Sequence, residues 1–273
     1  MIFRKINTLL IGLVSCLTVQ AQTLEKLWET DTILRVPECV YADTLRGVLY
    51  VSNIGGQPIQ KDEGSVAKLT PDGKVLAIDW IPGLNAPKGM ALSGKELFVA
   101  EPAVVVVIDV EAEKVVAKIP VPGAKMLNDV CAAPNGDVYV SDTRGGNIIR
   151  IRNRQPEVLV EGLDNPNGVL FANNKLHFVD KGRFYSLEGK EKKLLADDMD
   201  ESTDGIEQTA NGDFLISCWS GIIYYVKANG EKTTLLDTRA EKINAADIGW
   251  DVRKKIMYVP TFWKNKVVAY QLK

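Results

Sequence analysis

The chain contains a short hairpin pattern that recurs six times, and this repetition constrains the fold more than any other feature. In the clearest copy, residues 127–142, an apolar strand opens with Asn128-Asp129 and Asn135-Gly136 supplies the turn before an alternating strand. The six copies open at positions 37 to 50 residues apart: Glu38, Lys88, Asn128, Asn167, Asp204 and Asp247. Such a period is typical of propellers and solenoids.

The segments between the hairpins complete the units. Each of the first five units carries two further apolar runs, which gives four strands per unit, whereas the sixth unit ends one strand short. The strand-like run at residues 24–30 lies upstream of the first unit and has none of its own to complete. Pairing it with the last strand would close a ring and remove two open sheet edges. We therefore expect an all-β, six-bladed β-propeller closed by the N-terminal strand; the alternative is an open β-solenoid.

The first 21 residues predict an export signal. Arg4 and Lys5 precede an apolar run, and Val19-Gln20-Ala21 fits a cleavage site. The run is short for a membrane span, so we expect a periplasmic or secreted protein without a membrane span. Residues 13–16 also fit a lipoprotein box, which would instead leave a lipid anchor on Cys16.

The remaining residues 22–273 predict one propeller domain. No linker or block of like charge divides them, and loss of the signal changes the formal net charge from −2 to about −4. This charge argues against a nucleic-acid partner, and we expect a monomer.

The cysteines and the histidine do not form a metal-type pattern. Cys39, Cys131 and Cys218 are interpreted as small buried hydrophobic residues, with one disulfide among them as the alternative that export permits. His177, the single histidine, lies in the middle of a predicted strand and is interpreted as a structural residue between blades.

The six opening positions predict a polar ring at one mouth of the channel, because the innermost strand of every blade begins there. None of them is apolar in this alignment. Glu38 and Asp204 supply carboxylates, and Asn128 and Asn167 supply amide oxygens. Oxygens that converge in a channel of low dielectric require a cation, and an all-oxygen set favours Ca²⁺ or another hard divalent cation. A polar, water-filled channel is the alternative.

At these residues the chain resembles the gluconolactonase family, also called the senescence marker protein or regucalcin family. Its wider relatives include diisopropyl fluorophosphatase and the paraoxonases. The resemblance covers residues 22–273, and its specific part is a tetrad, one residue in each of four motifs: Glu38 after Pro37, Asn128 in Leu-Asn-Asp-Val, Asn167 in Pro-Asn-Gly-Val and Asp204 in Thr-Asp-Gly-Ile. It implies a six-bladed propeller that holds a divalent metal on the tetrad and hydrolyses small-molecule lactones or related esters.

The resemblance also implies roles for single residues. Asp204 is its candidate general base, with Asp129 and Asp247 as alternatives, and Asn128 would hold the substrate carbonyl. From its place in the ring, Lys88 would bind a substrate carboxylate or phosphate, or else neutralise nearby acids. Trp219 follows a strand end at the same mouth and would wall the pocket, or else pack between blades.

Two functions follow from these patterns. The first is an exported, calcium-dependent hydrolase of lactone or ester bonds. The second is a propeller that binds a ligand or partner without turnover, of the NHL-repeat kind or a degenerate lactonase. The tetrad favours the first. The second is favoured by Met126, which stands where sugar lactonases of the family carry an arginine, and by the lack of a channel histidine.

Overall fold

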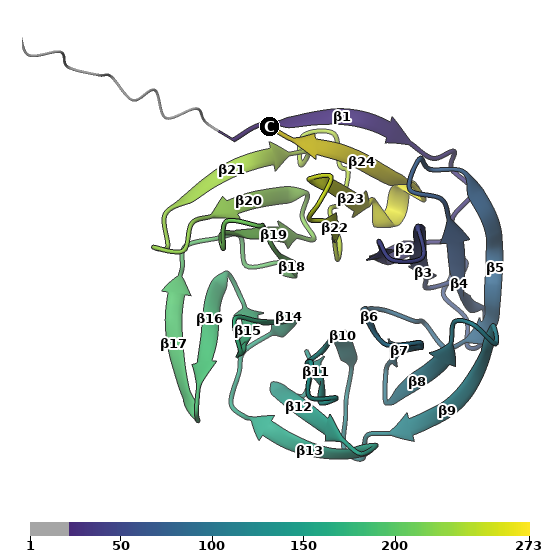
Figure 1. Cartoon of the computed structure of the whole chain (residues 1–273), viewed down its shortest axis with the longest axis horizontal. Helices are drawn as coiled ribbons and strands as arrows, with labels where there is room; N and C mark the ends of the chain where they lie inside the picture. Colours follow the sequence, from purple (N-terminus) through teal and green to yellow (C-terminus); the bar gives the residue numbers. More distant parts are fainter. Residues whose placement is uncertain (1–21) are drawn as a thin grey trace, which may run out of the picture.

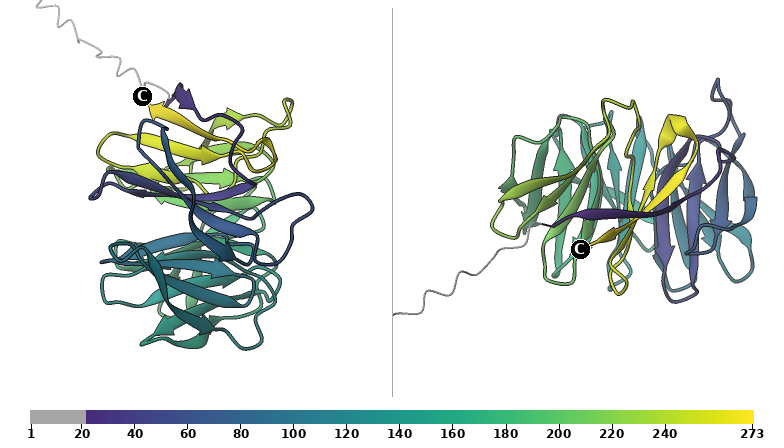
Figure 2. Two further views of the ribbon diagram at one scale, coloured as in Figure 1. Left: turned by 90° about the vertical axis from the view of Figure 1, so that its right-hand side faces the viewer. Right: turned by 90° about the horizontal axis from the view of Figure 1, so that it is seen from above.

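The computed structural model describes residues 22–273 and contains six four-stranded antiparallel sheets arranged as a ring (Figure 1). Seen edge-on, the blades stand side by side around the ring, and β1 runs along the rim (Figure 2). The predicted six-bladed β-propeller is confirmed. The predicted signal peptide, Met1–Ala21, and the candidate lipid site at Cys16 lie outside the described residues.

Each blade runs from an innermost strand on the channel to an outermost strand on the rim. Blades 1 to 3 consist of β2 (Pro37–Asp43), β3 (Val48–Asn53), β4 (Gly64–Leu69) and β5 (Val75–Leu84); β6 (Met90–Ser93), β7 (Glu96–Glu101), β8 (Val104–Asp109) and β9 (Lys114–Pro120); and β10 (Leu127–Ala132), β11 (Val138–Asp142), β12 (Asn147–Arg152) and β13 (Gln155–Val160). Blades 4 to 6 consist of β14 (Pro166–Ala172), β15 (Lys175–Asp180), β16 (Arg183–Glu188) and β17 (Glu191–Ala196); β18 (Thr203–Gln208), β19 (Phe214–Cys218), β20 (Ile222–Val226) and β21 (Lys232–Asp237); and β22 (Gly249–Asp251), β23 (Ile256–Pro260), β24 (Val267–Leu272) and β1 (Leu24–Glu29).

The N-terminal strand closes the ring. β1 pairs antiparallel with β24, from Leu24 opposite Leu272 to Glu29 opposite Val268, and so becomes the outermost strand of blade 6. Thr30 extends the pairing, because its backbone N–H donates to the carbonyl of Val267 at 3.0 Å. Both ends of the described residues 22–273 are therefore held in one sheet, as predicted from the missing strand of the sixth unit and the unpaired strand-like run at residues 24–30.

The hydrophobic core is divided among the six interfaces between blades. One buried cluster, for example, joins Val105 and Val107 of blade 2 to Val130 and Val140 of blade 3. Between residues 22 and 273 the only helical element is the 3-10 helix η1 (Phe262–Lys264). No helix in this part of the chain is long and apolar enough to cross a membrane. The channel is thus built almost entirely from strand residues.

The cysteines and the histidine occupy structural positions. Cys39, Cys131 and Cys218 are buried and free, which confirms their interpretation as small hydrophobic residues. His177 is buried against the rings of Phe184 and Phe214, with centroids 5.9 Å and 5.1 Å away. Burial lowers the pKa of His177, so it packs as a neutral side chain between blades 4 and 5.

Candidate functional site

Hydrogen bonds from backbone N–H groups to serine side chains place one residue of three innermost strands at the same level of the channel. In three blades the residue after the ring position donates its N–H to a serine Oγ of the second strand: Cys39 to Ser52 at 3.0 Å, Asp129 to Ser141 at 3.0 Å and Gly205 to Ser217 at 2.9 Å. The ring residues Glu38, Asn128 and Asp204 therefore share one level.

The sixth blade has the strand register that the sequence alignment predicts. Ala246 donates its N–H to the carbonyl of Pro260, the last residue of β23, at 3.1 Å, and so corresponds to Leu127, which pairs with the last residue of β11. Asp247 therefore aligns with Asn128, and the six aligned positions are all polar. Asp247 differs from the others in that it forms a parallel bridge with Cys39 and lines the cavity below the ring.

The tetrad residues are buried at the ring and carry an incomplete set of hydrogen bonds. Asn167 Nδ2 donates to Asp204 Oδ1 at 2.9 Å, and Asn128 Nδ2 donates to Thr143 Oγ1 at 3.1 Å. Lys88 Nζ lies 3.3 Å from Glu38 Oε1. Both amides thus use their nitrogens as donors, which leaves their oxygens available to accept.

Two oxygens of the tetrad are buried without a partner. Glu38 Oε2 and Asn167 Oδ1 accept no hydrogen bond from any residue in 22–273. An unpaired buried acceptor costs about 1–3 kcal/mol, and more when it is charged. Throughout the same residues, no three His, Cys, Asp or Glu side chains are grouped to hold a metal. A cation at the ring would therefore depend on the asparagine oxygens as well as on the two carboxylates.

Burial dominates the electrostatics of the ring. It raises the pKa of Glu38, and the ammonium of Lys88 partly opposes this shift. It raises the pKa of Asp204 well above its ordinary range, and the negative charge of Glu38 adds to the effect. Both carboxylates would ionise more readily beside a positive charge, so the donor set fits a divalent cation.

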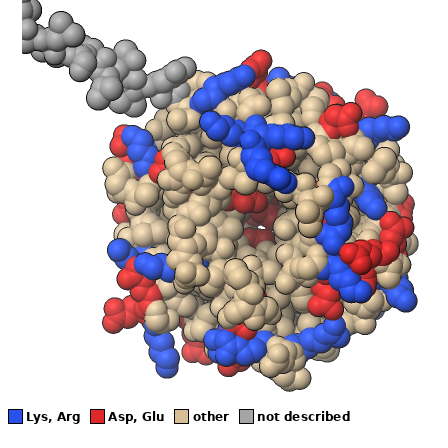
Figure 3. Space-filling view, in the orientation of Figure 1, with Lys and Arg blue, Asp and Glu red and all other residues tan. Residues whose placement is uncertain are grey.

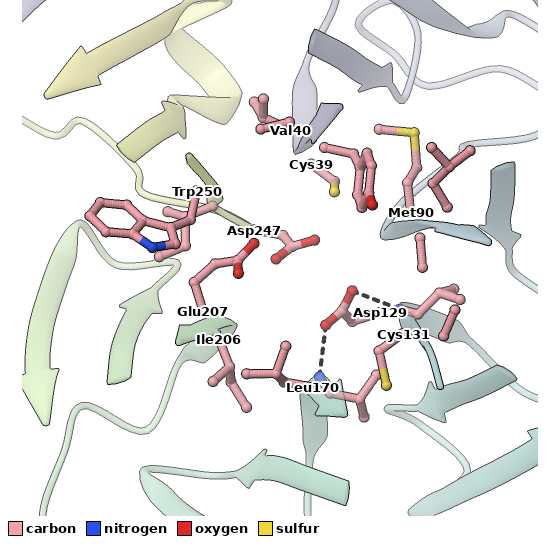
Figure 4. A pocket seen from close by; sticks show the side chains of 18 of the residues that line it. Cys39, Val40, Met90, Asp129, Cys131, Leu170, Ile206, Glu207, Asp247 and Trp250 are labelled. Carbon is pink, nitrogen blue, oxygen red and sulfur yellow. Dashed lines mark hydrogen bonds between the residues drawn. The ribbon is translucent and has the colours of Figure 1, made fainter. Parts of the chain in front are cut away.

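Below the ring, a second level of carboxyl groups faces a cavity of about 240 Å³ in the channel (Figure 4). Asp129 Oδ2 accepts a hydrogen bond from the N–H of Val169 at 2.7 Å, and burial raises the pKa of Asp129 to about 7. Burial also raises the pKa of Asp247 and brings that of Glu207 to about 8. The space-filling view shows acidic side chains inside the central hollow (Figure 3).

The cavity separates the predicted site residues into two groups. Of the candidates, Asp129 and Asp247 line it, together with Cys39, Tyr41 and Trp250, whereas the tetrad and Lys88 do not. Glu207 was missed by the sequence reasoning. The available signal was an acidic residue three positions after Asp204, where the innermost strands of blades 3 and 4 carry the apolar residues Cys131 and Leu170.

Glycines make room for the carboxylates of the lower level. A Cβ on Gly89 would lie less than 3.0 Å from both Oδ1 and Cα of Asp129. A Cβ on Gly205 would similarly lie less than 3.0 Å from Asp247 Oδ1. Each of these two positions must therefore be glycine, because any larger residue would overlap an acidic residue of the neighbouring blade.

The mouth has an aromatic side. Trp219 is 39% exposed and packs edge-on against Phe262, whose ring lies 4.7 Å from that of Trp263. Its backbone N–H donates to the carbonyl of Ser202 at 2.8 Å, so the loop after β19 is fixed. Trp219 thus packs against Phe262 and also leaves part of its ring exposed at the mouth.

The strand-end acid beside Met126 has a structural role. Asp142 accepts hydrogen bonds from the backbone N–H groups of Lys125 and Met126, at 2.9 Å and 2.8 Å. Asp180 does the same for Asp164 and Asn165 in the next blade. These carboxylates hold the loops that lead into the innermost strands and so position Asn128 and Asn167.

Comparison with known proteins identifies relatives at the level of the fold. No protein-family model and no curated protein matches the sequence. A gluconolactonase from Xanthomonas campestris superposes with a TM-score of 0.71 at 14% identity, over 88% of this chain and 87% of the other. The chain has the six-bladed propeller fold of the gluconolactonases.

Two further solved structures also resemble the chain. A putative gluconolactonase gives a TM-score of 0.70 at 15% identity, over 92% of both chains. Virginiamycin B lyase from Staphylococcus aureus gives 0.67 at 13% identity, over 93% of this chain and 100% of the other. Since a lactonase and a lyase resemble the chain about equally, the choice of reaction depends on its own side chains.

Proposed function

We propose that the protein is an exported hydrolase of lactone or ester bonds that depends on Ca²⁺, or another divalent cation, held by Glu38, Asn128, Asn167 and Asp204. The observation that carries this proposal is the pair of buried, unpartnered oxygens, Glu38 Oε2 and Asn167 Oδ1, in a ring whose other two donors are Asn128 and Asp204. Four oxygen donors leave room for water or substrate, since Ca²⁺ takes about 6 to 8 oxygen ligands.

The chemistry divides between the ion and the side chains. A bound divalent cation supplies Lewis-acid polarisation of a carbonyl and stabilisation of the oxyanion. Asp204 is the proposed general base, and its carboxylate is oriented by the hydrogen bond from Asn167 Nδ2 at 2.9 Å. It accepts a proton from the attacking water as the new carbon–oxygen bond forms. It then returns that proton to the alkoxide that leaves when the ester bond breaks.

Asp129 is the alternative base, one level deeper. Its two oxygens already accept the backbone N–H groups of Val130 and Val169, at 2.6 Å and 2.7 Å. These bonds fix the carboxylate and occupy one acceptor site on each oxygen. Asp204 is preferred because it lies at the ring itself, beside the proposed carbonyl site at Asn128 and Asn167.

The test is a panel of lactones and aryl esters assayed with calcium and with a chelator. Wild-type protein should hydrolyse at least one member, the chelator should abolish turnover, and Asp204→Asn should lower kcat by about 100-fold or more. Asp197→Asn, which removes an exposed carboxylate, is the matched control and should retain activity. Turnover that persists in the chelator would contradict the proposed metal dependence.

Binding without turnover is the second candidate function. It is favoured by Met126, whose uncharged side chain stands two residues before Asn128, where a substrate-contacting arginine is expected from the family resemblance. Failure of every substrate in the panel, together with calcium-dependent binding of a lactone in calorimetry, would support this second function.

A further inference from the structure

Lys88 is the basic residue of the ring, and its ammonium group is only partly used. Its side chain is 15% exposed, so it is largely buried yet reachable from the mouth. Nζ lies 3.3 Å from Glu38 Oε1, and no other carboxylate of residues 22–273 lies within ion-pairing distance. Since an ammonium carries three donors, two remain for another acceptor.

The cation proposed for the ring and Lys88 both interact with Glu38. Oε1 of Glu38 faces Lys88, whereas Oε2 is the buried oxygen without a partner. A divalent cation on Oε2 would take up negative charge of Glu38 and so weaken its pairing with the ammonium of Lys88. A buried ammonium without a full counter-ion is unfavourable. Lys88 would therefore favour a ligand that brings a negative charge.

The ring also separates Lys88 from the proposed base. Lys88 precedes β6 in blade 2, and Asp204 lies in β18 of blade 5, on opposite sides of a ring of six blades (Figure 1). A substrate whose carbonyl lies beside Asp204 would extend across the channel mouth toward blade 2. A group at its far end would meet the ammonium.

We infer, on the basis of the proposed hydrolase function, that the natural substrate is an anionic lactone or ester whose carboxylate or phosphate is bound by Lys88. Lys88 is then a specificity-determining residue, which contributes charge-assisted hydrogen bonds to a group remote from the scissile bond. Such bonds are worth a factor of about 10 to 100 in binding.

The experiment compares two substrates that differ only in charge: a γ-lactone carrying a carboxylate and the same lactone carrying a carboxamide. Its readout is the ratio of their kcat/KM values in calcium. Wild-type protein should prefer the carboxylate, and Lys88→Met should lower the ratio by about 10- to 100-fold. Lys88→Arg should retain most of the preference. Lys190→Met, which removes an exposed charge in the β16–β17 turn, is the matched control.

Competition distinguishes carboxylate from phosphate as the natural group. Inorganic phosphate and acetate are titrated as inhibitors of wild-type turnover, and the stronger inhibitor identifies the preferred anion. Inhibition by either anion that is lost in Lys88→Met supports the inference. Equal inhibition of wild type and Lys88→Met contradicts it.

The outcomes separate this inference from the proposed function. Turnover with the same substrate ratio in wild type and Lys88→Met would overturn the role of Lys88 and leave the hydrolase intact. Absence of turnover would overturn the hydrolase function. The anion site at Lys88 would then be tested separately, by calorimetry with the carboxylate lactone in calcium. Binding that Lys88→Met abolishes supports the anion site, and no binding to wild type refutes it.

A second readout does not depend on activity. Because Lys88 and the cation interact with the same carboxylate, Lys88→Met should bind calcium more tightly than wild-type protein in calorimetry. Unchanged or weaker calcium binding would show that the two do not share Glu38. A thermal melt in calcium confirms that each variant is folded before it is compared.

Discussion

Glu207 provides a quantitative test of the acidic channel. Its carboxyl group lies among the cavity residues, and burial raises its pKa from the ordinary value of 4.5 to about 8, with a smaller contribution from Asp129. The folded protein therefore keeps a proton that the unfolded chain releases as the pH rises. The associated stability is present below about pH 4.5 and is lost as the pH rises toward 8.

The perturbation is Glu207→Gln, which keeps the size of the side chain and removes its titration. Each tenfold change in proton affinity corresponds to about 1.4 kcal/mol, so the two pKa values predict a loss of about 4 kcal/mol between pH 5 and pH 9 in the wild type. The variant lacks this loss. Its free energy of unfolding, relative to wild type, should therefore rise by about 4 kcal/mol over the same range.

The assay is urea unfolding at a series of pH values from 5 to 9, with Glu241→Gln as a control on an exposed glutamate. The control profile should run parallel to that of the wild type. If the Glu207→Gln profile also ran parallel to it, the carboxyl group would be solvated, and the account of the channel as a low-dielectric cavity would be refuted.

Two further predictions concern the construction of the ring. Gly89→Ala should destabilise the fold by several kcal/mol, because the added Cβ would overlap Asp129. Gly56→Ala is the control and should change stability little, because only ordinary contacts surround its added methyl group. Similar urea midpoints for the two variants would contradict this prediction. Deleting residues 22–30 removes β1 and exposes the edge of β24, so the truncated chain should melt at a much lower temperature or aggregate. An unchanged melting temperature would refute closure of the ring by β1.

The sequence was sufficient to predict the propeller because turn residues and strand periodicity recur in every unit. The same repetition placed Glu38, Asn128, Asn167 and Asp204 at one level, since each opens a strand at an equivalent position. In blade 6 the strand pairing also aligns Asp247 with these residues. The sequence could not predict that the side chain of Asp247 lines the deeper cavity together with Asp129.

The lower level of the channel could not be predicted for a different reason. Glu207 and Asp129 approach the axis from different blades, and their shifted pKa values depend on burial by side chains distant in the sequence. A hairpin motif contains no information about depth along the channel. The division between a ring site and a separate cavity therefore became visible only in three dimensions.

The central claim is that the ring binds a divalent cation, and the most direct measurement is a crystal structure of the protein grown in calcium, with anomalous scattering used to locate the ion. The account predicts one ion within about 2.3–2.6 Å of both Glu38 Oε2 and Asn167 Oδ1. An ion bound instead among Asp247 and Glu207, or no ion at saturating calcium, would contradict it.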